Sequence, residues 1–146
     1  MMINTMKTAM IIASDAGART AGIIREELGK EVDLFSVSER SGCVRIDSIT
    51  DFTLRHFGDY EAFVFIGAMG ICVRAIAPCV TSKYADPAVV NVDTTGHFVV
   101  SVLAGHVGGA NALTERLARI LGAQPVVTTQ SDNTGLWALD LLGKEN

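Results

Sequence analysis

Residues 98–111 of the chain read FVVSVLAGHVGGAN, and a strand pattern, a glycine-rich turn and a helix start follow one another in them. The apolar run Phe98–Ala104 is typical of a buried β-strand. Residues 105–109 are rich in glycine, and residues 110–121 have the apolar spacing of an amphipathic helix. A turn that leads from a strand into a helix presents backbone N–H groups and the positive end of the helix dipole to an anion. The stretch therefore predicts a ligand-binding turn.

His106 lies inside this turn, and histidine is the side chain whose ordinary pKa lies closest to neutrality. Gly105, Gly108 and Gly109 allow positive φ angles and a close approach of a ligand to the backbone. His106 is therefore the candidate acid–base residue. The pattern leaves open that the glycines form only a tight connection and that His106 is structural. The spacing matches neither the dinucleotide-binding fingerprint nor a phosphate-binding loop.

Apolar strand patterns alternate with amphipathic helix patterns along the rest of the chain. We expect strands at residues 8–13, 32–37, 44–46, 62–66, 88–92, 98–103 and 126–129, and helices at residues 18–28, 48–57, 71–77 and 110–121.

This alternation predicts a three-layer α/β/α domain with a mostly parallel sheet, similar to flavodoxin and Rossmann folds. The polar segment Asp93–His97 predicts a β-hairpin over residues 88–103, in which the two strands pair antiparallel. Ser14 or Asp15 is expected to cap the first helix, and Gly122 is expected to end the last one.

Four connections rich in small or polar residues follow predicted strands, and they are Ser14–Gly17, Gly67–Gly70, Gly105–Gly109 and Thr128–Asp132. In open α/β sheets, ligands bind beyond the carboxyl ends of the strands. We therefore expect the four connections to converge at one edge of the sheet, where their main-chain amides would hold a polyanionic ligand.

The composition sets further bounds on the class of protein. The chain has 146 residues with 49% apolar residues, 19% charged residues and a net charge of −4, which fits one globular domain and argues against nucleic acid as a partner. Cys43, Cys72 and Cys79 form no Cys-x-x-Cys pair, which predicts reduced thiols and no metal site. No apolar run reaches the roughly 18 residues of a membrane span, and the N-terminal apolar patch favours a strand over a signal peptide. We expect a cytoplasmic protein.

Four blocks in the second half of the chain carry a family resemblance, and they read GAMGICVRAIAP, SKYADPAVVNVD, GHFVVSVLAGHVGGAN and LARILGAQPVVTTQSDN. In this order they resemble the N-terminal region of cobalamin biosynthesis protein G, the cobalt-precorrin-5A hydrolase family. The resemblance covers residues 65–133, about half of the chain. It implies that the protein opens the δ-lactone on ring A of a cobalt-corrinoid intermediate and releases acetaldehyde, in the anaerobic route to vitamin B12.

The resemblance also implies roles for particular residues. Lactone opening needs a base and a donor for the developing oxyanion, which suggests His106 for the first role and the backbone of Gly108 and Gly109 for the second. Arg74 is expected to pair with a substrate carboxylate, unless it forms a surface salt bridge. The candidates for substrate binding are Gly67, Gly70, Arg74, Lys83, Gly105, Gly108, Gly109, Asn111, Thr128, Thr129 and Asp132.

Three more of these candidates have a structural alternative. Lys83 forms a positioned ion pair with Asp86, unless Asp86-Pro87 only starts an ordinary turn, and Thr128 and Thr129 either line the site or cap the next element. We expect no cofactor, because cobalt is carried by the substrate macrocycle.

Family members carry further domains, so residues 1–135 are expected to form the N-terminal domain and residues 136–146 to begin a middle region. The expected partners are the cobalt-corrinoid substrate and the C-terminal domains, and this chain alone is expected to be inactive. Two other hypotheses remain, namely a non-catalytic corrinoid-binding or assembly module, and a flavodoxin-like domain that binds a mononucleotide at Ser14–Gly17 and Gly105–Gly109.

Overall fold

The structure is a computed structural model that describes residues 6–105 and 107–129. Its elements, in chain order, are β1 (Thr8–Ile12), η1 (Asp15–Gly17), α1 (Ala18–Leu28), η2 (Gly29–Glu31), β2 (Val32–Ser36), β3 (Val44–Arg45), α2 (Ile49–His56), β4 (Ala62–Ile66), α3 (Met69–Ile76), β5 (Ala88–Val92), β6 (Phe98–Leu103), α4 (Ala110–Leu121) and β7 (Gln124–Val126).

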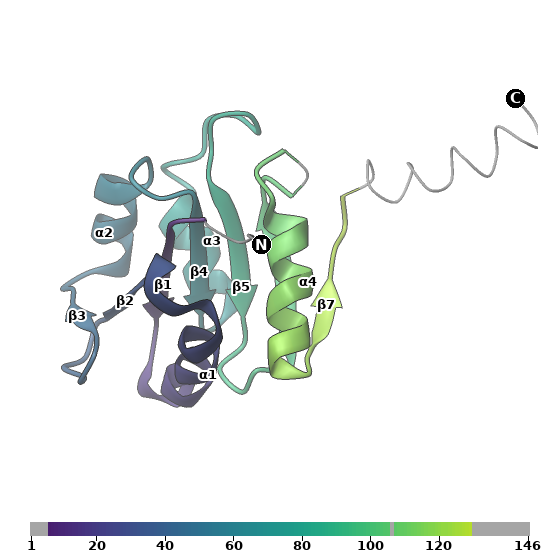
Figure 1. The fold of residues 1–146 in the computed structure, drawn as a ribbon. Coiled ribbons are helices and arrows are strands. Elements are labelled where there is room, and N and C mark those ends of the chain that lie inside the picture. Colours follow the sequence, from purple (N-terminus) through teal and green to yellow (C-terminus); the bar gives the residue numbers. More distant parts are fainter. Residues whose placement is uncertain (1–5, 106, 130–146) are drawn as a thin grey trace, which may run out of the picture.

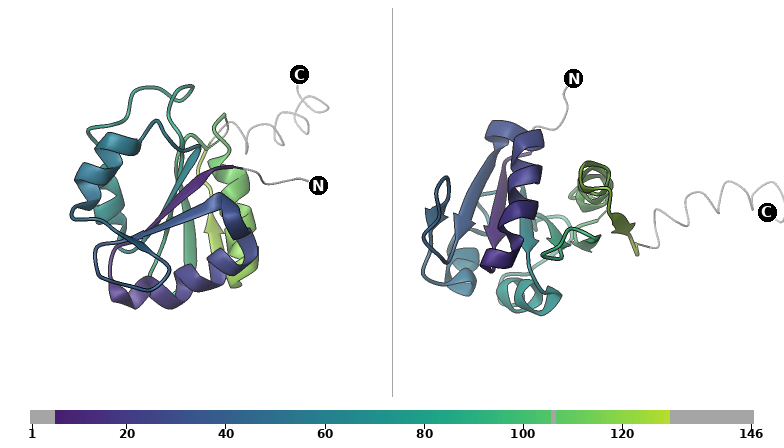
Figure 2. Two further views of the ribbon diagram at one scale, coloured as in Figure 1. Left: turned by 60° about the vertical axis from the view of Figure 1, so that its left-hand side comes forward. Right: turned by 90° about the horizontal axis from the view of Figure 1, so that it is seen from below.

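The described strands form one seven-stranded sheet in the order β3-β2-β1-β4-β5-β6-β7. Every neighbouring pair is parallel except β5 and β6, which pair antiparallel with Val92 opposite Val99. Helices α1 and α4 cover one face, and α2 and α3 cover the other (Figure 2). The predicted three-layer α/β/α fold with its hairpin at residues 88–103 is confirmed.

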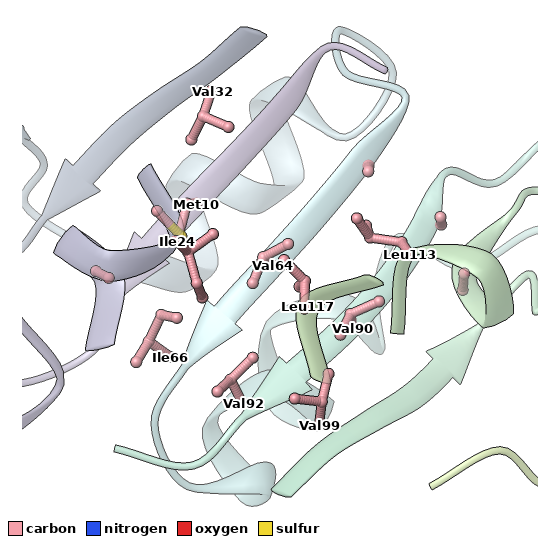
Figure 3. Close-up of a cluster of buried hydrophobic side chains, with 14 of the residues drawn as sticks. Met10, Ile24, Val32, Val64, Ile66, Val90, Val92, Val99, Leu113 and Leu117 are labelled. Atoms are coloured by element: carbon pink, nitrogen blue, oxygen red, sulfur yellow. The ribbon is translucent and has the colours of Figure 1, made fainter. Parts of the chain in front are cut away.

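Each central strand supplies side chains to both layers, because successive residues of a strand point to opposite faces. Met10 and Val64 face α1 and α4, where Ile24 and Leu117 pack against them (Figure 3). Phe63 lies on the other face in the core beneath α2 and α3. All five are at most 1% exposed, and burying a side chain of this size stabilises the fold by about 2 kcal/mol.

The hairpin that reverses β6 is held by the side chain of Asp93. Its carboxylate accepts hydrogen bonds from the main-chain N–H groups of His97, at 2.8 Å, and Phe98, at 2.6 Å. Gly96 adopts a positive φ of 74° in the same turn, a conformation that glycine takes without a steric penalty. The sequence-based prediction of this turn is confirmed.

The reversal of β6 overturns the expected convergence of four turns at one edge. Ser14–Gly17 and Gly67–Gly70 follow the parallel strands β1 and β4, so both lie at the carboxyl edge of those strands. Because β6 and β7 run in the opposite direction, Gly105–Gly109 and the residues after β7 lie at the other edge (Figure 1). The single cradle built from all four turns is therefore wrong.

Two local predictions also fail. The last strand covers Gln124–Val126 and not residues 126–129, because Pro125 is accommodated in the edge strand β7, where its missing N–H costs no ladder bond. Helix α1 begins after Gly17 with no side-chain cap, and Asp15 pairs with Arg40 at 2.7 Å. The expected helix end at Gly122 is confirmed by its φ of 67°.

Candidate functional site

The turn between β6 and α4 is held in a conformation that most residues avoid. Ala104 has a φ of 57° and Gly109 a φ of 89°. An alanine in this region costs about 1–2 kcal/mol, so surrounding contacts must maintain it. The first helical N–H groups also bind inside the turn, from Ala110 to the Ala104 carbonyl at 3.2 Å and from Asn111 to the Gly105 carbonyl at 2.9 Å.

These bonds change which donors a ligand can use. The N–H groups of Ala110 and Asn111 are occupied, whereas those of Gly108 and Gly109 donate no hydrogen bond within the described residues. A Cβ at Gly108 would lie 2.6 Å from Ala104 Cβ, so this position is closed to side chains. The turn can therefore offer two adjacent backbone donors to an anion or an oxyanion.

The side chain of Asn111 holds the turn in place through two hydrogen bonds. Its Oδ1 accepts a hydrogen bond of 2.7 Å from the Ser101 hydroxyl, and its Nδ2 donates one of 2.6 Å to Thr129 Oγ1. The side chain is buried, with 7% of the residue exposed. The structure thus connects β6, the start of α4 and the segment after β7 through one amide group.

The connection from α3 to β5 reaches the same edge of the sheet, beside the turn of residues 104–109 (Figure 1). Asp86 is 7% exposed, and its carboxylate accepts hydrogen bonds from the Thr81 N–H and hydroxyl groups. Lys83 does not pair with Asp86, and its ammonium group lies 5.4 Å from the centre of the Tyr84 ring. The turn interpretation of Asp86 is therefore the correct one.

The structure divides the candidate residues between the two edges. The candidates that lie at the edge at which β6 ends are Lys83, Gly105, Gly108, Gly109, Asn111, Thr128 and Thr129. Gly67, Gly70 and Arg74 lie at the opposite edge, where the parallel strands β4 and β5 end, or on the helix that starts there. His106 and Asp132 lie outside the described residues.

The glycine at position 67 is explained by packing. It is buried, and a Cβ there would lie 2.7 Å from Ala13 Cβ. Its carbonyl accepts a hydrogen bond of 3.2 Å from Asn91 Nδ2.

Arg74 is exposed, and its Nη1 lies 3.2 Å from the Cβ position of Gly70, over the start of α3.

Sequence reasoning missed two polar residues that organise these edges. Asn91 is the one polar residue in the buried strand β5, and Ser101 is the one polar residue in β6, where it is buried although much of that strand is partly exposed. That interruption was the available signal, since buried polar side chains are retained where they form hydrogen bonds.

In the part of the chain that the structure describes, His, Cys, Asp and Glu form no group of three that could hold a metal ion. None of the helices within the described ranges combines the length and hydropathy needed to cross a bilayer. The mononucleotide hypothesis required Ser14–Gly17 and Gly105–Gly109 to share a site, and their positions at opposite edges contradict it.

A mostly parallel α/β sheet in which β6 and β7 run opposite to the other strands, with a braced glycine turn after β6, defines an open α/β domain. A family model described as Cobalamin synthesis G N-terminal matches residues 51–132, more than half of the chain. The chain belongs to this family.

Curated relatives match more than half of the chain. The chain is 56% identical over 86 residues to a cobalt-precorrin-5A hydrolase of Salmonella typhimurium, a match that covers 59% of this chain and 24% of the relative. It is 48% identical over 88 residues to a cobalt-precorrin-5A hydrolase of Priestia megaterium, covering 60% and 24%. The matched part thus spans about a quarter of the length of these relatives.

A solved structure supports the fold assignment over more of the chain. The crystal structure of a cobalamin biosynthesis protein G homolog from Sulfolobus solfataricus matches with a TM-score of 0.67 and 26% sequence identity. The match covers 85% of this chain and 38% of that one.

Proposed function

We propose that the chain acts as the N-terminal domain of a cobalt-precorrin-5A hydrolase in the cytoplasm, with the C-terminal domains of the family completing its substrate site. The observation that carries the proposal is the family match over residues 51–132, which contain the strained Ala104, and the Salmonella typhimurium relative is 56% identical over its matched residues. Strain of this kind persists where the surrounding structure enforces it, and it is often found at functional sites.

The proposed chemistry is the opening of the ring A δ-lactone of a cobalt-corrinoid, with release of acetaldehyde. Water attacks the lactone carbonyl, the C–O bond of the ester breaks, and a carboxylate and a hydroxyl group form. The hydroxyl group then loses its proton as the C–C bond between its carbon and the macrocycle breaks, which releases acetaldehyde and leaves the electron pair of that bond, and then a proton, on the macrocycle. His106 would accept the proton of the attacking water as general base. The N–H groups of Gly108 and Gly109 would stabilise the oxyanion that develops on the carbonyl oxygen.

The remaining candidates at this edge have a supporting role in the proposal. Lys83 would attract the peripheral carboxylates of the macrocycle, and Asn111, Thr128 and Thr129 would keep the turn in place. The role of Asp132 remains a prediction. Gly67, Gly70 and Arg74 would contact substrate only from the opposite edge, so we do not include them in the same subsite.

The test is a chimera in which residues 51–132 of this chain replace the matched segment of the Salmonella typhimurium relative. We expect the chimera to release acetaldehyde from cobalt-precorrin-5A, measured with a coupled alcohol dehydrogenase assay. His106→Ala should lower kcat about 100-fold or more, because a positioned general base contributes about 10²–10⁴ in rate.

His97→Ala is the matched control, since His97 is exposed and lies in the hairpin between β5 and β6, at the edge of the sheet opposite the glycine turn. It should leave the rate within a factor of about two, as expected for a surface change. A folded chimera that releases no acetaldehyde would refute the proposed function. Equal rates for His106→Ala and His97→Ala would remove His106 from the mechanism.

A further inference from the structure

A groove of about 620 Å³ runs along the side of α4 from the glycine turn. Gly109, Leu113, Arg116 and Ile120 recur every three or four residues, so they line one side of the helix. Met6 forms part of the opposing wall, and its Cε lies 3.0 Å from the Cβ position of Gly109. The groove therefore begins at the turn already described and extends away from it.

The groove combines apolar walls with unpaired positive charge. Arg116 Nη1 is buried and has no hydrogen-bond partner among the described residues. Neither Arg116 nor Arg119, which also lines the groove, forms an ion pair within the described ranges. A buried N–H donor without an acceptor is costly, so a bound molecule that supplies an acceptor here would be stabilised by Arg116.

We propose that this groove binds the edge of a planar, carboxylated tetrapyrrole, with Arg116 paired to a peripheral carboxylate. The inference rests on the proposed function and adds a substrate subsite to it. Met6, Leu113 and Ile120 would contact the apolar face of the ring, and Arg119 would meet a second carboxylate at the exposed rim. Guanidinium suits this task because its planar fork binds carboxylates through two parallel hydrogen bonds.

The size and position of the groove agree with this occupant. Its volume falls within the range of about 300–1,000 Å³ that is typical of small-molecule sites. Gly109 belongs both to the groove and to the turn with the two available N–H groups, so a ring held along α4 would place one edge beside those donors. The alternative occupant is an acidic segment of another domain, which would bring carboxylates to the groove but no planar ring.

The test uses the 146-residue chain and a stable probe pair, dicyanocobyrinic acid and its fully methylated ester, followed by isothermal titration calorimetry. The two probes share the macrocycle and differ in the carboxylates. We expect the acid to bind at least about 10-fold more tightly than the ester, because charge-assisted hydrogen bonds contribute to affinity. Arg116→Met should weaken binding of the acid about 10- to 100-fold and leave binding of the ester unchanged.

Arg45→Met is the matched control, since Arg45 pairs with Asp47 and lies on β3, the edge strand at the opposite end of the strand order from β7. It should bind the acid like the unaltered chain. If Arg116→Met fails to fold by circular dichroism, Arg116→Lys keeps the charge but removes the planar fork, and it should still weaken binding of the acid about 10-fold. Equal affinities for acid and ester, or unchanged binding in the folded Arg116 variants, would overturn the proposal.

The same substitutions separate this inference from the proposed function. An active chimera whose KM is unchanged by Arg116→Met would refute the groove and leave the hydrolase assignment intact. A folded chimera without activity, together with binding of cobyrinic acid that depends on Arg116, would refute the hydrolase assignment and support the groove.

Discussion

The Asn111 side chain donates a hydrogen bond of 2.6 Å to the Thr129 hydroxyl, across 18 residues of sequence. Through this bond the start of α4 is fixed to the segment that follows the edge strand β7. The same amide accepts a hydrogen bond from Ser101 on β6, so the glycine turn is held from two sides. The turn is therefore a preformed part of the fold.

Replacement of Asn111 by alanine should destabilise the protein by about 2–3 kcal/mol. It removes one buried and one partly buried hydrogen bond and leaves the Ser101 hydroxyl without its acceptor, and each loss costs about 1 kcal/mol or more. Thr129→Val removes one of these bonds and should cost about 1 kcal/mol. Urea unfolding measures both values. An Asn111→Ala variant no less stable than Thr129→Val would show that the amide does not brace the turn.

Alanine at Gly108 should destabilise the fold by about 1–3 kcal/mol, because its Cβ would lie 2.6 Å from Ala104 Cβ and 2.9 Å from the Ala104 carbonyl oxygen. Adding Ala104→Gly should restore only part of this loss, since the carbonyl contact remains. Gly58→Ala has no atom within 4 Å of its new Cβ and should change stability by less than about 0.5 kcal/mol. Thermal unfolding of the three variants checks the prediction, and it fails if Gly108→Ala behaves like Gly58→Ala.

The hairpin carboxylate should make stability depend on acid pH. Burial alone would raise the pKa of Asp93, but hydrogen bonds from Thr95, Phe98 and His97 outweigh it and hold the pKa below the usual value of 3.8. A carboxyl group with a depressed folded-state pKa stabilises the protein above its unfolded-state pKa, and this contribution is lost as the pH falls through the folded-state pKa.

Asp93→Asn should therefore lower stability at neutral pH, and its difference from the unaltered protein should shrink as the pH falls below 3.8. Urea unfolding at a series of pH values measures the difference. Asp47→Asn, in an exposed ion pair, is the comparison that should show little effect at any pH. A difference for Asp93→Asn that does not vary with pH would contradict the assignment.

Cys72 should resist thiol reagents until the protein unfolds. The thiol is fully buried, and burial raises its pKa to about 12, so almost no thiolate is present at neutral pH. Cys43 and Cys79 are partly exposed and should react first with Ellman's reagent, although burial also raises the pKa of each thiol. Mass spectrometry of the labelled protein before and after addition of urea identifies the sites. Labelling of Cys72 in the native protein at the rate of Cys43 would contradict the buried position.

Most of the fold could be predicted from local sequence patterns. The strand at Ala62–Ile66 and the helices Ala18–Leu28 and Ala110–Leu121 agree with their expected bounds. The continuous apolar runs indicated strands buried on both faces, and β4 and β5 are buried throughout. The last strand begins two residues before the predicted start at residue 126, because an edge strand tolerates Pro125.

The candidate site could be predicted only in part. The block Gly105–Asn111 was correctly recognised as one turn leading into a helix. Its grouping with Gly67–Gly70 failed because the rule about carboxyl ends applies to parallel strands, and the predicted hairpin reverses β6. Arg116 was overlooked, because its charge on a helix is unremarkable until the groove beside it is known.

The sequence by itself determined the elements, the hairpin and the glycine positions, because periodicity and turn chemistry act between residues close together in the chain. Only the tertiary structure decided which turns share an edge, which amide braces the site, and which arginine on α4 finds no acceptor among residues 6–105 and 107–129. Those properties depend on strand direction and on contacts such as Asn111–Thr129, which form between segments that local preferences do not connect.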